Sequence, residues 1–153
     1  MNTPVQRLGY VTWQLAQAIG SQIERGVRPL DLTTAQALAL STLHAAPGLT
    51  TAELARRSSF TPQSMGSAVA DLVERNLVAY ALSERDRRVK ELLLTSQGTQ
   101  LAHRVGAVID GIDDRLLGAL DRRDRPVALR LLTRMLAQAN PTALKLINDS
   151  EGG

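Results

Sequence analysis

Residues 83–95 read SERDRRVKELLLT, and the change of character within this stretch decides the fold. Every position from Glu84 to Arg88 is charged, whereas positions 92–94 are all leucine. The apolar run LVAYAL at 77–82 precedes the charged segment, so two short strand-like runs flank one polar loop. This order is typical of a β-hairpin whose loop is longer than a two-residue turn. We therefore predict a strand on each side of an arginine-rich loop.

Two short helices are predicted immediately before this hairpin. Thr33 and Gln36 have the spacing of a capping box, which predicts a helix that runs to about Ala45. Thr50 and Glu53 repeat this spacing and open the first of the two short helices. Thr61 is expected to cap the second, with Pro62 at its first position, where a missing N–H costs nothing. The second helix is expected to continue to Arg75. Helix, tight turn, helix and hairpin in this order predict a winged helix-turn-helix.

Longer helices are predicted on both sides of this unit, because apolar residues recur at three- and four-residue steps over 4–25, from Ser96 onward and from about Pro126. They carry more apolar surface than a monomer of this length covers, which favours a homodimer. The sequence thus predicts a mainly α fold with a small β-hairpin (α+β). Its predicted parts are an N-terminal dimerisation helix and linker at 1–32, the winged helix-turn-helix at 33–95, C-terminal dimerisation helices at 96–147 and a disordered tail at 148–153.

The composition limits the classes of protein that remain. The chain has 153 residues, of which 44% are hydrophobic and 22% charged, so it is long enough to bury a core as one domain or two intimately packed halves. Its formal charge of +3 permits a nucleic-acid partner without demanding one. The absence of cysteine excludes disulfides, thiol nucleophiles and most structural zinc sites. With no leader-like or membrane-spanning run, a cytoplasmic protein with no membrane partner is expected.

The second helix of the helix-turn-helix supplies the first candidate DNA contacts. In this motif the N-terminal side chains of the second helix meet base edges in the major groove. The polar side chains expected there are those of Thr61, Gln63, Ser64 and Ser67. Glutamine can pair bidentately with adenine, and serine and threonine can bond to bases or phosphates. The alternative is that these are ordinary polar surface residues of a capped helix.

The hairpin loop supplies the second set of candidate contacts, from Arg85, Arg87 and Arg88. A narrow minor groove attracts arginine through its enhanced negative potential. Asp86 lies two positions before Arg88, so its carboxylate is expected to orient that guanidinium before DNA is met. The alternative is a solvated charged loop, which the preceding helix-turn-helix disfavours.

Two segments together resemble the multiple antibiotic resistance regulator (MarR) family: LTTAELARRSSFTPQSMGSAVADLVERNLV at 49–78 and DRRVKELLLTSQG at 86–98. The stretch LTTAQALAL at 32–40 agrees with this resemblance. Its most specific element is Asp86-x-Arg88 followed by Leu94-Thr95-x-x-Gly98. Where the family commonly has glycine in the turn, this chain has Ser59, so the turn is expected to need a strained serine. The family also commonly carries an arginine near Tyr80, so one backbone contact is expected to be missing.

The resemblance implies a homodimeric transcriptional regulator, a repressor that leaves a pseudo-palindromic operator on double-stranded DNA when a small-molecule effector binds. In the family the second helix reads the major groove and the wing arginine enters the minor groove. Those roles would fall on Thr61, Gln63, Ser64 and Ser67, and on Arg88. The terminal helices of two subunits would interleave, and we expect an effector pocket between them and the winged-helix core.

Other residues carry weaker signals. Trp13 and His44 are candidate effector-binding residues, although an aromatic residue on an apolar helix is more often part of the core. His44 and His103 lie far apart in sequence without ligand spacing, so no metal site is expected. No phosphate-binding loop and no nucleophile with a plausible base can be assembled, so neither enzymatic activity nor a cofactor is expected. The alternative function of another class is a winged-helix module that binds a protein and has no affinity for DNA.

Overall fold

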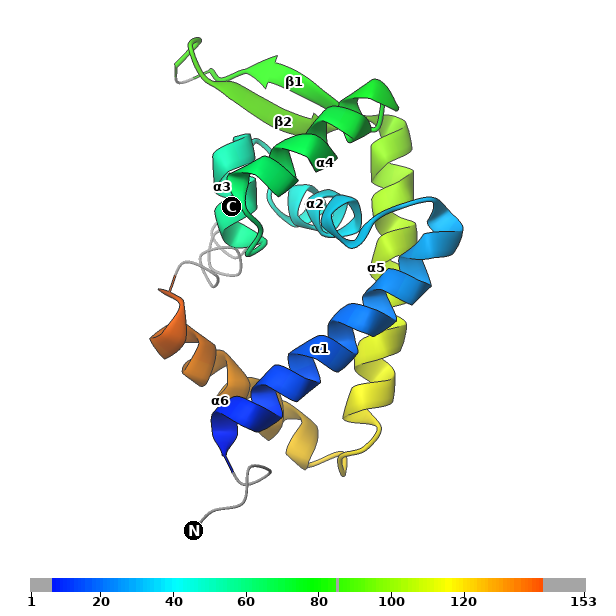
Figure 1. Ribbon diagram of the computed structural model, residues 1–153, viewed down its shortest axis with the longest axis vertical. Helices are drawn as coiled ribbons and strands as arrows, with labels where there is room; N and C mark the ends of the chain where they lie inside the picture. The colour runs from blue at the N-terminus through cyan, green and yellow to red at the C-terminus, as the bar shows by residue number, and fades with distance from the viewer. Residues whose placement is uncertain (1–6, 85, 142–153) are drawn as a thin grey trace.

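The winged-helix body lies at one end of the molecule, and the long terminal helices extend from it to the other end (Figure 1). The computed structural model describes residues 7–84 and 86–141. Its elements are, in chain order, α1 (Leu8–Val27), the 3₁₀ helix η2 (Arg28–Leu30), α2 (Thr34–Ala45), α3 (Thr51–Arg57), α4 (Pro62–Glu74), β1 (Val78–Leu82), β2 (Lys90–Leu94), α5 (Ser96–Leu117) and α6 (Asp124–Ala139). The predicted fold class, mainly α with one β-hairpin, is confirmed.

The terminal helices differ slightly from the predicted bounds. The N-terminal helix, predicted over 4–25, begins only at Leu8, because Arg7 is extended, and it continues to Val27; residues 4–6 lie outside the described residues. Gly26 lies inside α1, and its missing Cβ makes room for the side chain of Val108 on α5. Proline stops α1, since Pro29 follows in η2. At the other end, α6 starts two residues before Pro126, which its first turn tolerates.

The predicted segment boundaries stay predictions at the C-terminal end, because residues 142–147 and the tail at 148–153 lie outside the described residues. Among the helices that are described, none combines the length and the apolar character that a membrane span requires.

A threonine hydroxyl fixes the start of α2, α3, α4 and α5. In each case the hydroxyl oxygen accepts the backbone N–H three residues on: Gln36 to Thr33 (3.2 Å), Glu53 to Thr50 (3.2 Å), Ser64 to Thr61 (3.1 Å) and Gly98 to Thr95 (3.0 Å). At α2 and α3 the glutamine and glutamate side chains return the bond, which completes the predicted capping boxes. Each such cap is worth about 1 kcal/mol, so the helix starts are strongly specified.

The wing is an antiparallel pair in which Tyr80 lies opposite Leu92. The connection between α2 and α3 forms an isolated β-bridge to it, between Leu49 and Leu92. The N–H of Leu92 donates to the carbonyl oxygen of Leu49 (2.8 Å), and the N–H of Gly48 donates to the carbonyl oxygen of Leu92 (3.1 Å). This bridge was not expected from the sequence, and its backbone bonds tie the wing to the helix-turn-helix.

An aliphatic core lies between α2, α3, α4, the hairpin and the first half of α5. Its fully buried large side chains include Leu40, Leu43, Leu54, Met65, Val69, Leu72, Val78, Leu92 and Val105. No aromatic side chain is among them, as the scarcity of aromatic residues requires. The core therefore packs the helix-turn-helix and the wing into one body.

The hairpin joins α5 at the carbonyl group of Leu77. The N–H of Thr95 donates to this oxygen (3.1 Å), and the Thr95 hydroxyl lies within hydrogen-bond distance of both Asn76 O (2.8 Å) and Leu77 O (3.2 Å). Gly98 lies directly against the same carbonyl, so a Cβ added there would overlap the Leu77 oxygen. This close approach explains why a glycine follows the capping threonine at this spacing.

Gly98→Ala is expected to destabilise the protein by about 1–3 kcal/mol, the usual cost of forcing an atom into a packed site. The same substitution at Gly106, also in α5 but with open space around its Cα, is the matched control. Gly106→Ala should stabilise by about 0.5–1 kcal/mol, because alanine loses less backbone entropy in a helix. Urea unfolding at one fixed protein concentration measures both. Effects of equal sign would contradict the proposed close contact.

Candidate nucleic-acid interface

Four predicted DNA-contacting side chains lie at the N-terminal end of α4. Thr61, Gln63, Ser64 and Ser67 are all exposed, whereas Met65, Ala68, Val69 and Leu72 of the same helix are buried in the core. The helical period separates the two sets, so the polar residues form one outward face. The structure therefore brings these candidates together on a single surface.

The turn before α4 holds a residue in the left-handed region. Ser59 has φ 57°, which an L-residue other than glycine enters at a cost of roughly 1–2 kcal/mol. The N–H of Phe60 donates to the carbonyl oxygen of Ala55 (3.1 Å), which completes a Schellman motif at the end of α3. The strained serine expected from the sequence is present, and it sets the direction in which α4 leaves the turn.

Asp86 and Arg88 form a two-pronged ion pair on the wing. Arg88 Nε donates to Asp86 Oδ1 (3.1 Å) and Arg88 Nη2 donates to Asp86 Oδ2 (3.0 Å). The backbone N–H of Arg88 adds a third bond to Asp86 Oδ1 (3.0 Å). The Arg88 side chain remains 90% exposed. The expected contact is thus present, and it presents an extended guanidinium to the exterior.

The rest of the predicted wing set is only partly described. Arg87 is exposed beside Arg88, and Arg85 lies outside the described residues. Below the tip, the N–H of Ser83 donates to the carbonyl oxygen of Val89 (3.0 Å), and the N–H of Val89 donates to that of Asp86 (2.9 Å). These bonds close the loop and fix the backbone on which Arg88 stands.

The ion pair perturbs both of its members. Hydrogen bonds from the Arg88 side chain, and then from its backbone N–H, hold the pKa of Asp86 below its usual value. In return, the Asp86 carboxylate raises the pKa of Arg88. Both groups are therefore charged at neutral pH.

The pKa of Asp86, followed by NMR of its carboxyl carbon, tests this pair. Because the folded pKa is lowered, the pair is fully present above the ordinary aspartate pKa of about 3.9 and is lost as the pH falls through the folded value. Arg88→Ala should raise the pKa of Asp86 toward about 3.9. The adjacent Arg87→Ala should leave it low. An Asp86 pKa that is the same in the wild-type protein and in Arg88→Ala would show that the two side chains do not pair in solution.

The two candidate effector residues lie on different helices, Trp13 on α1 and His44 on α2. Trp13 is 63% exposed in the single chain, so it lies outside the core that the sequence favoured for it. His44 and His103, unrelated by spacing in the sequence, are brought into a T-shaped ring contact with centroids 4.6 Å apart. Among residues 7–84 and 86–141, no group of three or more histidines or acidic residues is placed to hold a metal ion.

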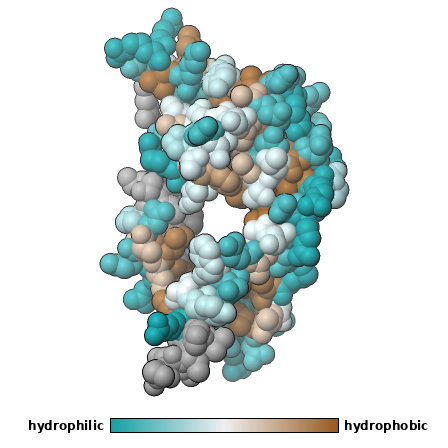
Figure 2. Space-filling model, viewed as in Figure 1, coloured by the Kyte–Doolittle hydropathy of each residue, from teal (hydrophilic) through white to brown (hydrophobic). Residues whose placement is uncertain are grey.

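An apolar groove of about 650 Å³ lies between α1 and α6. Its walls include Leu8, Leu15 and Ile19 from α1, and Leu132 and Leu136 from α6. An effector pocket was expected between the terminal helices and the winged-helix core, whereas this groove lies between the two terminal helices themselves. Hydrophobic residues also gather on α6 beside the opening through the molecule (Figure 2).

A family model described as the MarR family matches residues 30–89. The chain is also 32% identical over 128 residues to the HTH-type transcriptional repressor Rv2887 of Mycobacterium tuberculosis (strain ATCC 25618 / H37Rv). That match covers 84% of this chain and 92% of the relative. The chain belongs to the MarR family.

Two solved structures of Rv2887 are similar to this MarR-family chain over its fold. The crystal structure with salicylic acid has a TM-score of 0.72 at 32% identity and covers 84% of this chain and 96% of that one. The complex with DNA has a TM-score of 0.70 at 30% identity and covers 84% and 97%. The family match at 30–89 contains both α4 and the Asp86–Arg88 pair.

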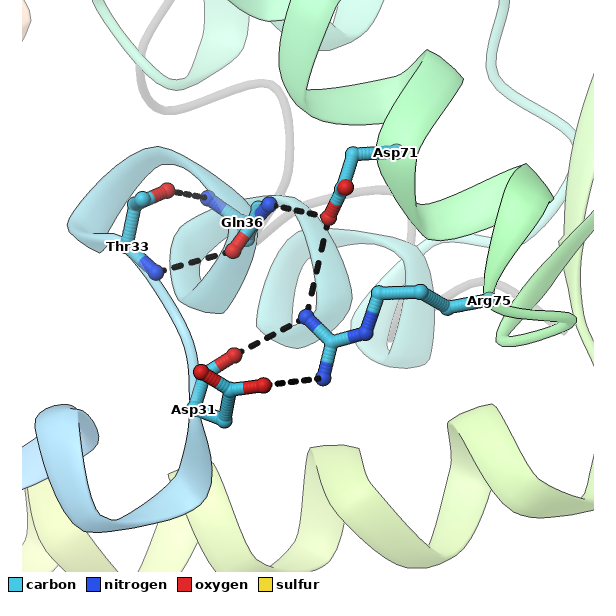
Figure 3. A network of polar contacts seen from close by, with 5 residues as sticks. All are labelled: Asp31, Thr33, Gln36, Asp71 and Arg75. Carbon is cyan, nitrogen blue, oxygen red and sulfur yellow. Dashed lines mark hydrogen bonds and ion pairs between the residues drawn. The ribbon is translucent and has the colours of Figure 1, made fainter.

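The sequence did not predict the contacts of several polar residues near α4. Gln36 was recognised only as a capping residue and Arg75 only as a helix end, yet they belong to one polar network with Asp31 and Asp71 (Figure 3). The i, i+4 spacing of Asp71 and Arg75 is the one local signal for it in the sequence.

Proposed function

We propose that the protein is a homodimeric, DNA-binding transcriptional repressor that leaves a pseudo-palindromic operator when a small-molecule effector binds. It would act in the cytoplasm on double-stranded DNA and would need no cofactor. One observation carries the proposal: the exposed polar face of α4 and the Asp86-held Arg88 belong to one rigid winged-helix body in a MarR-family chain.

The first step assigns α4 to the major groove. Its exposed side chains at Thr61, Ser64 and Ser67 are short, so the helix can approach the base edges closely. Gln63 is the longest of the set and can offer a donor and an acceptor to one adenine. The uncrowded start of the helix also suits a phosphate, because its N–H groups and dipole favour an anion.

The second step assigns the wing to the minor groove. Asp86 uses two of the five N–H donors of the Arg88 guanidinium and leaves the others for DNA. Because the pair extends the side chain beforehand, Arg88 loses less conformational freedom on binding. In the minor groove A·T and T·A look alike, so Arg88 would respond to groove width and charge more than to base identity.

The terminal helices support the homodimer. None of the residues of α6 is buried, and Leu129, Leu131 and Leu132 are among its exposed apolar side chains. On α1, Leu8 and Val11 are exposed as well. A second copy would cover these faces, and permanent homodimers typically bury more than roughly 2,000 Å² in total. Two-fold symmetry would then place two half-sites about one helical turn apart.

That a small-molecule effector acts on this chain is inferred from its likeness to Rv2887. That protein has been crystallised with salicylic acid, with p-aminosalicylic acid and with DNA. If an effector weakens DNA binding by this chain, linkage requires that DNA weaken effector binding by the same factor. If the effector instead competed with DNA for the same surface, the two ligands could not be bound at once and the effect would not be allosteric.

Binding to a duplex selected in vitro with the wild-type protein, measured by fluorescence anisotropy at two salt concentrations, tests the two assignments. Arg88→Ala should weaken binding to the selected and to a scrambled duplex together, and should reduce the salt slope by about one unit, because one positive charge that releases counterions from the DNA is lost. Gln63→Ala should cost about 1–3 kcal/mol on the selected duplex and little on the scrambled one.

Asp86→Ala should mimic a weakened Arg88, since it removes the carboxylate that holds the guanidinium. Arg130→Ala is the matched control, because this exposed arginine lies on α6, at the end of the molecule away from the wing (Figure 1). If the wild-type protein selects no duplex at either salt concentration, the alternative of a protein-binding winged helix is favoured. An Arg88→Ala variant with unchanged affinity and salt slope would leave the wing as a solvated loop.

A further inference from the structure

The C-terminal end of α4 is bonded to the linker that follows α1 (Figure 3). Arg75, the C-cap of α4, donates from Nη1 to the carbonyl oxygen of Asp31 (2.9 Å), 44 residues earlier in the chain. Its guanidinium also lies 3.8 Å from Asp31 Oδ2 and 3.6 Å from Asp71 Oδ2. We call Asp31, Gln36, Asp71 and Arg75 the Arg75 network.

Gln36 joins α2 to the same network with the two ends of its amide. Its Oε1 accepts the N–H of Thr33 (2.8 Å) and caps α2, whereas its Nε2 donates to Asp71 Oδ2 (2.6 Å). The amide orientation is fixed, because a reversed amide would set N–H against N–H at one end and oxygen against oxygen at the other. At 8% exposure, Gln36 is one of the few buried polar residues of the described chain.

Asp31 and Asp71 are the acceptors through which the linker after α1, α2 and α4 are bonded to one another. Asp31 ends η2 in the left-handed conformation (φ 56°), which aspartate enters more readily than most residues. Asp71 Oδ2 lies beside both the Gln36 amide and the Arg75 guanidinium. A single carboxylate oxygen thus links α2 with the C-terminal end of α4, and Arg75 extends that link to the linker from α1.

We infer that Arg75, Asp71 and Gln36 are positioning residues that fix the orientation of α4 relative to α1, and that they thereby set the half-site spacing that the dimer accepts. The inference rests on the proposed function, since it presumes that α4 reads DNA. The apolar core that packs α4 against α2 and α3 is non-directional, whereas charge-assisted hydrogen bonds have defined distances and angles. The network therefore specifies an angle that the core alone leaves less constrained.

A small change in that angle has a large effect at the other end of α4. The helix has 13 residues and is about 20 Å long. A tilt of about 10° about its C-terminal end would move its N-terminus by about 3.4 Å, the rise of one base pair. Because α1 belongs to the proposed dimer region, the same tilt in both subunits would change the separation of the two reading surfaces.

The test compares two duplexes for each variant. The first is the duplex selected in vitro with the wild-type protein, and the second has one base pair inserted between its half-sites. We define the spacing ratio as the affinity for the selected duplex divided by the affinity for the duplex with the insertion. It reports how strictly the dimer fixes the distance between its two α4 helices. A change that merely lowers stability or overall affinity affects both duplexes and leaves the ratio unchanged.

Gln36→Glu is the central variant, because it keeps a carboxyl oxygen to cap Thr33 but places a second carboxylate against Asp71. We expect its spacing ratio to fall by about 2- to 30-fold, the range of coupling changes that network mutations produce. Combining Gln36→Glu with Asp71→Asn exchanges donor and acceptor, so this hydrogen bond re-forms although the contact between residue 71 and Arg75 is lost. The ratio should therefore recover in part, to a value above that of Gln36→Glu alone. Arg28→Ala is the matched control, since Arg28 lines the same depression but pairs with Glu24 rather than with α4.

Light scattering and circular dichroism establish that each variant is a folded dimer. Should Gln36→Glu fail to fold, Arg75→Lys, which keeps the charge and loses the planar fork, must lower the spacing ratio instead. An unchanged ratio in a folded Gln36→Glu or Arg75→Lys dimer, or an equal fall in Arg28→Ala, would overturn the inference while leaving the proposed function intact. A wild-type protein that selects no duplex would overturn both, and that failure appears before any variant is made.

Discussion

The carbonyl group of Leu77 is the constraint on which the arrangement of the winged-helix body depends. It lies just after α4, just before β1 and directly against the first turn of α5. Thr95 bonds to it from the end of β2, and Gly98 leaves the space that this approach needs. The end of α4, which we propose reads DNA, both strands of the wing and the start of α5 therefore meet around one peptide oxygen.

The two surfaces that we propose contact DNA are held in place by different kinds of interaction. The start of α4 is set by a threonine cap and by the left-handed Ser59, and its far end is tied by Arg75. The tip of the wing depends on local bonds alone, with Arg88 held by Asp86 on an exposed loop. A rigid helix suits recognition of base identity, and an exposed, held guanidinium suits a groove whose width varies with sequence.

Sequence patterns among neighbouring residues predicted the helices and strands, but not the contacts between segments that are far apart in the chain. The caps at Thr33 and Thr50 and the hairpin were predictable because each depends on residues that are neighbours in sequence. The Asp86–Arg88 contact was predictable for the same reason. The Asp31–Arg75 bond was not, because the two residues are 44 positions apart and neither is unusual locally. The bridge between Leu49 and Leu92 was not predicted either, since a single bridged residue leaves no period in the sequence to detect.

Methylation interference on the selected duplex tests the central claim, that α4 reads a major groove while Arg88 enters a minor groove. Dimethyl sulfate modifies guanine N7 in the major groove and adenine N3 in the minor groove, so one experiment probes both surfaces. We expect guanine methylation to block binding in two segments about one helical turn apart, with interference by adenine methylation in the minor grooves that flank them. Arg88→Ala should abolish only the adenine signal. Interference at neither position, or an adenine signal that survives Arg88→Ala, would contradict this account.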